Sequence, residues 1–306
     1  MFNPATDLIH TCIKQLQTGY RGTYGDLKPA YLELINHVAM TTLRTIAGSD
    51  ALYHNLEHTV LVTLVGQEIL RGKQLREGNV SCRDWAHFIV SLLCHDIGYV
   101  KGACSQDKPA LRSYSTGTHQ TAVVIEAGAT DASLTAYHID RGKRFVAETF
   151  LGQPLLDLAV IQNNIELTRF PVPAEPFYQE TASYGGLTRA ADLLGQLSDP
   201  RYLEKIPALF YEFAEVGTNQ ALGYRHPGDL RASYPHFFYH VVQSYVRQAL
   251  YYLEATQRGQ TIISNLYNNV AIVEQELQAG GPQATNSDTA PSCCKELTTG
   301  SRAPVS

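Results

Sequence analysis

The dipeptide His95-Asp96 ends an almost entirely apolar run, residues 85–94, and this pairing constrains the fold more than any other feature of the chain. A helix of this composition is expected to be buried, so its end carries two ionisable side chains into the interior. An unpaired buried carboxylate costs several kcal/mol or changes its protonation state. A metal ion would satisfy both side chains, and the sequence therefore predicts a buried metal site here.

A second pair of histidines lies upstream, in the segment Tyr53-His54-Asn55-Leu56-Glu57-His58. Side chains four positions apart lie on one face of an α-helix. The apolar spacing predicts a helix over residues 52–71, with Gly48-Ser49-Asp50 as the break and N-cap before it. We therefore expect His54 and His58 to face the core together.

The predicted site needs a further carboxylate, and Asp192 is the best candidate for it. This residue lies inside the segment Leu187-Thr-Arg-Ala-Ala-Asp-Leu-Leu-Gly195. Aspartate is a poor helix-interior residue, so its position among apolar and small residues indicates a role other than helix formation. The predicted metal ligands are His58, His95, Asp96 and Asp192.

Most of the remaining chain has helical spacing. A short hairpin is expected within residues 119–126, inside a long loop, 99–137, that is a candidate lid. Residues 217–235 are rich in turn-forming residues. Further helices are expected over residues 5–18, 29–47, 138–150, 154–167, 187–195, 199–216, 236–256 and 261–278.

The candidate ligands run from position 54 to 192, so no independent domain boundary can fall between them. We predict an all-α protein with one small β-hairpin insertion, in which residues 1–279 form a single domain. From Gly280 the composition turns to Gly, Ser, Thr, Pro and Ala, which is typical of disorder. Residues 280–306, including Cys293-Cys294, are therefore expected to form a disordered tail.

The net charge of -5 argues against general nucleic-acid binding, which relies on a basic surface. Hydrophobic residues make up 44% of the 306 residues, enough for a large core. The N-terminus lacks the pattern of a signal peptide, and no apolar run is long enough to span a membrane. Six cysteines without metal or disulfide spacing fit a reducing compartment. The expected protein is soluble and cytoplasmic.

Basic side chains that could hold a phosphate group are Lys101, Arg141 and Arg144. Lys101 follows the His-Asp pair, and the two arginines lie in the helix expected over residues 138–150. A solvent-exposed charged helix face explains the arginines equally well.

With these residues placed, the chain resembles the HD superfamily of metal-dependent phosphohydrolases, a helical fold named after its His-Asp pair. The resemblance covers residues 29–215 and rests on the order His58, His95-Asp96, Asp192. The His-Asn-x-x-His segment, the apolar run before the pair and the Ile-Gly after it strengthen the resemblance. It implies a single HD-type helical domain that holds one or two divalent ions.

Within this superfamily, Tyr53-His54-Asn55 followed by His58 is similar to the motif of class I cyclic-nucleotide phosphodiesterases. That similarity implies that His54 is the proton donor and His58 a metal ligand. The phosphodiesterase pattern has an aspartate three residues after the second histidine, and this chain has Leu61 there, with no aspartate in Thr59-Val-Leu-Val62. His95-Asp-Ile-Gly98 also matches the HD-GYP group, but Asn163-Asn164 stands where that group has paired histidines.

The resemblance implies hydrolysis of a phosphomonoester or phosphodiester by metal-activated water, with a nucleotide or cyclic nucleotide as a candidate substrate. Asp96 would also act in catalysis by bridging to a second ion, which His138 would help to hold. Imidazole and carboxylate ligands suit Mn, Fe, Zn or Ni better than Mg. Two alternatives remain open: a di-iron oxygenase that also uses His119 and His138, and a noncatalytic regulatory module. The sequence does not identify the substrate, the metal or the oligomeric state.

Overall fold

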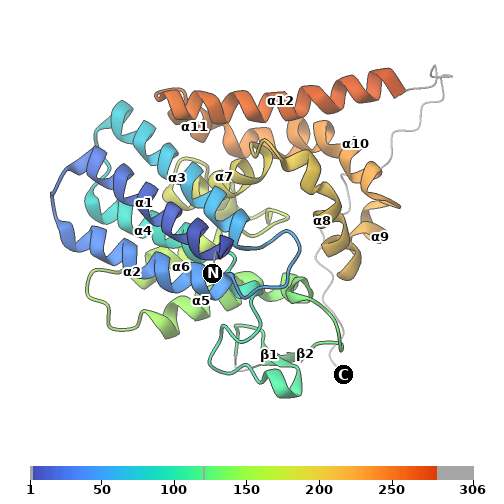
Figure 1. The fold of residues 1–306 in the computed structure, drawn as a ribbon, viewed down its shortest axis with the longest axis horizontal. Helices are drawn as coiled ribbons and strands as arrows, with labels where there is room; N and C mark the ends of the chain where they lie inside the picture. Colours follow the sequence, from blue (N-terminus) through green and yellow to red (C-terminus); the bar gives the residue numbers. More distant parts are fainter. Residues whose placement is uncertain (1–2, 120, 281–306) are drawn as a thin grey trace.

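The computed structural model describes residues 3–119 and 121–280, which form a helical protein with one two-stranded antiparallel sheet (Figure 1). This is the predicted fold class. The predicted tail, apart from Gly280, lies outside the described residues. The α-helices are α1 Pro4–Tyr24, α2 Pro29–Ile46, α3 Leu56–Glu77, α4 Cys82–Cys94, α5 His138–Thr149, α6 Leu158–Glu166, α7 Tyr184–Leu197, α8 Tyr202–Glu215, α9 Thr218–Leu222, α10 Pro227–Phe237, α11 Gln243–Leu253 and α12 Gln257–Gly280.

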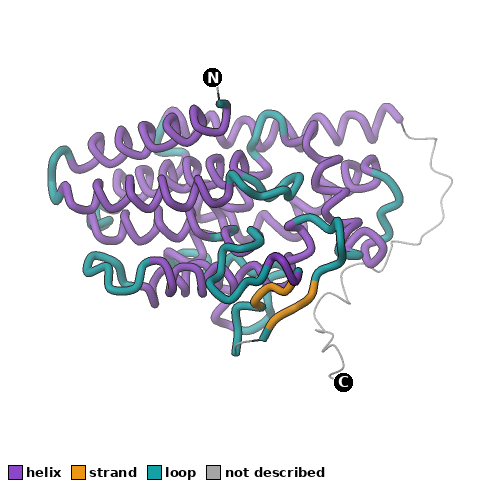
Figure 2. The backbone as a smooth tube through the Cα atoms, turned by 60° about the horizontal axis from the view of Figure 1, so that its bottom comes forward, coloured by secondary structure: helices purple, strands orange, loops and turns teal. Residues whose placement is uncertain are grey.

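Shorter elements connect these helices. The strands β1 and β2 pair so that Tyr114 lies opposite Val123. Figure 2 shows them on a loop at the edge of the helical body. The short elements are the 3₁₀ turns η1 Ile97–Tyr99, η2 Pro109–Leu111, η3 Asp131–Tyr137 and η4 Pro176–Gln179, the π-helical turn η5 Phe238–Val242, and the strands β1 Ser113–Ser115 and β2 Ala122–Val124.

Polar capping residues start several helices. The side chain of Asn3 accepts hydrogen bonds from two backbone N–H groups at the start of α1. Ser81 and Asp84 form a reciprocal capping box at the start of α4. Ser183 accepts from the N–H of Gly186 and begins α7. These caps satisfy backbone donors that have no partner inside the helix.

The start of α3 differs from the prediction. Asn55 is the N-cap, and its side chain accepts hydrogen bonds from the N–H groups of Glu57 and His58. The helix therefore begins at Leu56, and His54 lies before it in an irregular segment. The prediction that His54 and His58 share a helical face is wrong, because the asparagine side chain caps the helix between the two histidines.

Helix α3 lies at the centre of the bundle and packs against α1, α4, α7 and α11. Two glycines permit this close packing. A Cβ atom at Gly66 would lie 2.2 Å from Leu92 of α4, and one at Gly195 of α7 would lie 2.7 Å from Val62 of α3. Every residue of α4 from Trp85 to Cys94 is buried. One apolar core runs from Ile9 to Val273, and the end of α4 lies within it.

The C-terminal third contains more helix than predicted. The sequence predicts turns over residues 217–235, whereas the structure has α9 and most of α10 there. Gly217 and Gly223 adopt left-handed conformations just before and just after α9, and Pro227 opens α10. Glycine and proline therefore mark helix ends here rather than a continuous loop. In Figure 1, α12 lies across α10 and α11.

The predicted hairpin is present, but its bounds are different. Only its second strand falls within residues 119–126, and the first strand is Ser113–Ser115. That strand, Ser-Tyr-Ser, is only three residues long, which is too short for an alternating pattern to be recognised. Among the described residues, no helix is both long and apolar enough to cross a membrane.

Candidate metal centre

Four predicted side chains converge from three helices. His58 lies in the first turn of α3, His95 and Asp96 directly follow α4, and Asp192 lies in α7. The Nε2 atom of His58 is 3.2 Å from Oδ2 of Asp96 and 3.2 Å from Oδ1 of Asp192. The Nε2 atom of His95 is 3.2 Å and 3.5 Å from the same two oxygens. The structure therefore brings all four residues together.

The facing atoms are buried and lack hydrogen-bond partners. His58, His95 and Asp96 are at most 4% exposed. Within the described residues, neither histidine Nε2 nor the Asp96 Oδ2 atom makes a hydrogen bond. A buried polar atom without a partner is costly, and three such atoms directed into one small space are rare in folded proteins. A bound cation would satisfy all three.

The spacing of the facing atoms also fits a metal ion. Nitrogen and oxygen ligands bind Zn²⁺ at about 2.1 Å, so ligands of one tetrahedral ion lie about 3.4 Å apart. The four histidine-to-aspartate separations, 3.2–3.5 Å, agree with this value. In the described parts of the chain, His58, His95 and Asp192 form a group whose ligand atoms all lie within 4.8 Å of one another.

Hydrogen bonding prepares His95 to be a ligand. Its Nδ1 atom lies 2.7 Å from the carbonyl oxygen of Leu92, to which it donates. The Nε2 atom therefore carries the lone pair that a metal ion needs. Burial disfavours a charged Asp96, but the neighbouring His95 and His58 hold the pKa of its carboxyl well below the usual range. The carboxylate is thus ionised, as metal binding requires.

His54 lies beside this group and is held by a residue that the sequence did not indicate. Its Nδ1 atom is 2.5 Å from Oε2 of Glu212, a residue of α8 that is 3% exposed. The other Glu212 oxygen accepts the N–H groups of Tyr53 and His54. Burial lowers the pKa of His54, but the Glu212 carboxylate outweighs burial and raises the pKa to about 9.

His138, the predicted ligand of a second ion, lies at the edge of the site. Its Nδ1 atom is 2.6 Å from the carbonyl oxygen of Thr135, which leaves Nε2 as an acceptor. Burial lowers its pKa, so the imidazole is neutral. Its ring stacks on Tyr99, which in turn stacks on His54. His138 is thus linked to the proposed proton donor through one aromatic ring.

The structure gives Arg141 a different place from the one expected for a phosphate-binding residue. Its guanidinium is fully buried and donates to the carbonyl oxygens of Gly98, Val100 and Ser115 and to both oxygens of Asp107. These bonds use all five N–H groups of the side chain. Arg141 therefore fixes the loop after Asp96 and has no donor left for a phosphate.

Lys101 and Arg144 are also engaged in the same loop. The Nζ atom of Lys101 lies 2.5 Å from the carbonyl oxygen of Ala129 and 3.6 Å from Asp131. Arg144 donates to Glu148 and to the hydroxyl of Ser115. The three basic residues therefore hold the loop together in this structure, and none of their bonds is to the histidine and aspartate cluster.

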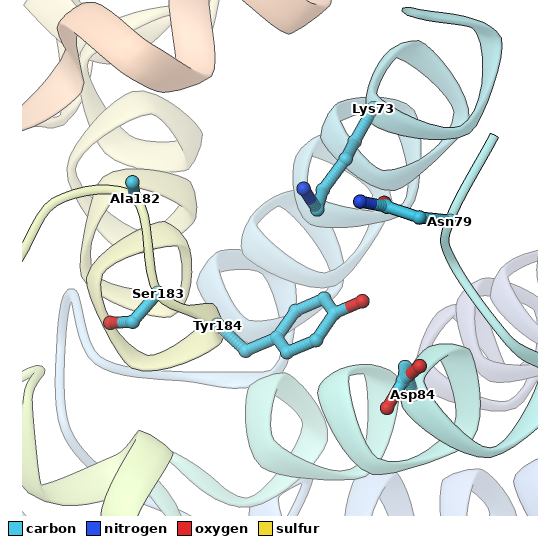
Figure 3. A pocket seen from close by; sticks show the side chains of 6 residues that line it. All are labelled: Lys73, Asn79, Asp84, Ala182, Ser183 and Tyr184. Atoms are coloured by element: carbon cyan, nitrogen blue, oxygen red, sulfur yellow. The ribbon is translucent and has the colours of Figure 1, made fainter. Parts of the chain in front are cut away.

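One cavity, larger than the cavity beside His58, lies away from the cluster. Its volume is about 310 Å³, and Figure 3 shows the side chains around it. Lys73 follows His58 by fifteen residues along α3, which corresponds to about 22 Å. A smaller cavity, of about 120 Å³, adjoins His58 itself. The larger cavity is lined by Lys73, Asn79, Asp84, Ala182, Ser183 and Tyr184.

The fold is similar to that of a phosphodiesterase domain. The crystal structure of the phosphodiesterase domain of the RhoPDE fusion protein from the choanoflagellate Salpingoeca rosetta aligns with a TM-score of 0.54 at 15% identity. The alignment covers 91% of this chain and 94% of that chain, and it shows a shared fold. The chain belongs to the Npun_R2479-like family, whose model matches residues 2–276. No curated protein sequence matches it.

Proposed function

We propose that this protein is a metal-dependent phosphohydrolase of the HD superfamily, acting on a phosphomonoester or phosphodiester. The observation that carries the proposal is the set of buried, unpartnered atoms of His58, His95 and Asp96, directed together with Asp192 into one space. The phosphodiesterase-like fold supports the proposal. The proposal also includes that residues 1–279 form one domain. This domain would act in the cytoplasm on a small-molecule substrate.

His58, His95, Asp96 and Asp192 would hold one divalent ion. When bound, such an ion supplies a Lewis acid for the phosphoryl oxygens and lowers the pKa of water so that hydroxide forms at neutral pH. His138, neutral and with a free Nε2, is the proposed ligand of a second ion, together with Asp96. The mixed nitrogen and oxygen donors favour Mn, Fe, Zn or Ni over Mg.

His54 is the proposed general acid. Glu212 accepts the Nδ1 proton of the ring and favours the charged form, so the opposite nitrogen, Nε2, carries a proton that can be donated. Hydrolysis of a phosphate ester needs a proton on the leaving oxygen when that oxygen is a poor leaving group. The expected substrates, nucleotides and cyclic nucleotides among them, have such leaving groups.

The oxygenase alternative uses His119 and His138 as additional ligands. His119 is exposed in the turn between β1 and β2, which argues against this role. A noncatalytic module would have no need to keep the four ligand side chains together. Hydrolysis therefore remains the function that the geometry favours.

Metal analysis of the purified protein, followed by a substrate screen, tests the proposal. We expect one or two transition-metal ions per chain, and hydrolysis of a cyclic nucleotide, a nucleoside monophosphate or bis(4-nitrophenyl) phosphate with Mn²⁺. EDTA should abolish the activity, and the His58→Ala variant should lose both metal and activity. A chain that binds no metal and hydrolyses none of these esters would contradict the proposal. Iron with oxygen uptake would favour the oxygenase.

A further inference from the structure

Tyr99 lies between His54 and His138, two histidines beside the proposed first metal site that are not among its ligands. Its ring centroid is 4.7 Å from that of His54, with an angle of 12° between the planes. On the other side, the His138 ring is 4.4 Å away at an angle of 22°. The three rings form one nearly parallel stack, and Tyr99 is only 3% exposed. Flat contacts of this kind restrict both histidine rings at once.

The backbone that carries Tyr99 is itself fixed against α5. A Cβ atom at Gly98 would lie 1.9 Å from the carbonyl oxygen of His138, so only glycine permits this close approach. The Nε–H group of Arg141 donates to the carbonyl oxygen of Gly98 at 2.6 Å. The turn Ile97–Tyr99 and the start of α5 therefore form one rigid unit, in which Tyr99 has a defined position beside His138.

Among the described residues, the ring of each histidine makes one hydrogen bond. The Nδ1 atom of His54 is bound to Glu212, and that of His138 to the carbonyl of Thr135. One hydrogen bond fixes the position of Nδ1 but still lets the ring rotate about it and move Nε2. The flat contact with the Tyr99 ring removes that freedom, because rotation would drive the imidazole into Tyr99.

We infer that Tyr99 is a positioning residue that aligns the Nε2 atoms of His54 and His138 for the reaction. The inference rests on the proposed function, since it assigns to His54 the proton donation and to His138 the second ion. Tyr99 itself contacts the two imidazoles and takes no part in proton transfer. A displacement of a catalytic group by about 1 Å can cost on the order of 10²-fold in rate.

Three variants test this role. Tyr99→Leu removes the ring, whereas Tyr99→Phe keeps the ring and loses only the hydroxyl group. Tyr114→Leu is the matched control, because Tyr114 is equally buried in the same loop but packs against Ile125 and Leu134. Each variant is assayed with two substrates: diphenyl phosphate, whose phenolate is a poor leaving group, and bis(4-nitrophenyl) phosphate, whose nitrophenolate is a good one. The metal content of each variant is also measured.

We expect Tyr99→Leu to lower kcat for diphenyl phosphate by about 10- to 100-fold, with KM within about threefold and the first ion retained. The loss should be smaller for the nitrophenyl ester. Tyr99→Phe should restore kcat to within about threefold of the wild type. A wild-type kcat in Tyr99→Leu, or an equal loss in Tyr114→Leu, would overturn the inference.

A second measurement does not depend on activity. In the metal-free protein, the hydrogen-bonded ring N–H protons of His54 and His138 should exchange slowly with solvent in NMR spectra. Exchange should be at least about tenfold faster in Tyr99→Leu and unchanged in Tyr99→Phe and Tyr114→Leu. Unchanged exchange in Tyr99→Leu would refute the positioning role. Absence of hydrolysis in the wild type would refute the proposed function, and the exchange experiment would still decide the role of Tyr99.

Discussion

Replacing Glu212 by glutamine should remove the charge that keeps His54 protonated. The glutamine oxygen can still accept the backbone N–H groups of Tyr53 and His54, so the local backbone is preserved. Glu212 raises the His54 pKa to about 9. A return to the ordinary 6.5 corresponds to about 3 kcal/mol of interaction between the two side chains, and burial would lower the pKa further.

This interaction also makes stability depend on pH. Because the folded pKa of His54 lies above the unfolded 6.5, its contribution is complete below pH 6.5 and is lost as the pH rises through about 9. NMR titration of the metal-free wild type and Glu212→Gln proteins measures the pKa directly. We also expect Glu212→Gln to lower kcat for poor leaving groups by about 10²- to 10⁴-fold, with metal content unchanged. An unchanged His54 pKa in the variant would refute this reasoning.

Three further predictions concern other residues. Asp96→Asn should abolish hydrolysis and weaken metal binding while circular dichroism shows unchanged helix content; full turnover with stoichiometric metal would argue against the site. Arg141→Met should lower the free energy of unfolding in urea by about 3–5 kcal/mol, because it leaves Asp107 buried without its cation, whereas Arg144→Met should cost less than about 1 kcal/mol. Burial lowers the pKa of His87, so its contribution to stability is complete above pH 6.5 and falls as the pH drops; the melting temperature of His87→Gln should therefore decline less between pH 7 and 5 than that of the wild type.

The centre of the site could be predicted from the sequence because burial makes ionisable residues conspicuous. The run before His95 is so apolar that its helix had to be buried, and the structure places every residue from Trp85 to Cys94 in the interior. Asp192 was predicted for the same reason, as a carboxylate among small and apolar residues. Both predictions depend on local sequence, and the structure brings the two side chains together.

Glu212 could not be predicted, because nothing in the neighbouring sequence distinguishes it from other glutamates in amphipathic helices. Its partner, His54, is 158 residues earlier in the chain. The available signal was its spacing, since Glu212 follows Leu209 by three residues and therefore falls on the buried side of α8. A charged residue on an apolar face needs a partner, but the sequence does not reveal which one.

The position of Arg141 could not be predicted either, for a related reason. A basic cluster in the sequence fits a solvent-exposed face or a phosphate site, whereas the structure buries one arginine of the cluster completely. Its partners are mainly backbone carbonyl groups, at Gly98, Val100 and Ser115. Carbonyl groups are present at every residue, so no sequence pattern marks them as the partners of a particular side chain.

Helix α8 contacts both the segment that carries His54 and the loop of residues 99–137. Glu212 binds His54, and three residues later Glu215 accepts hydrogen bonds from the N–H and hydroxyl groups of Thr130, both at 2.7 Å. Residues three apart lie on the same helix face, so one turn of α8 holds both the segment before α3 and the loop of residues 99–137. That loop was a candidate lid by its length. For this loop to open, the contact between Glu215 and Thr130 would have to break. The Arg141 contacts would still hold the first half of the loop. Any opening is therefore confined to the part around Thr130.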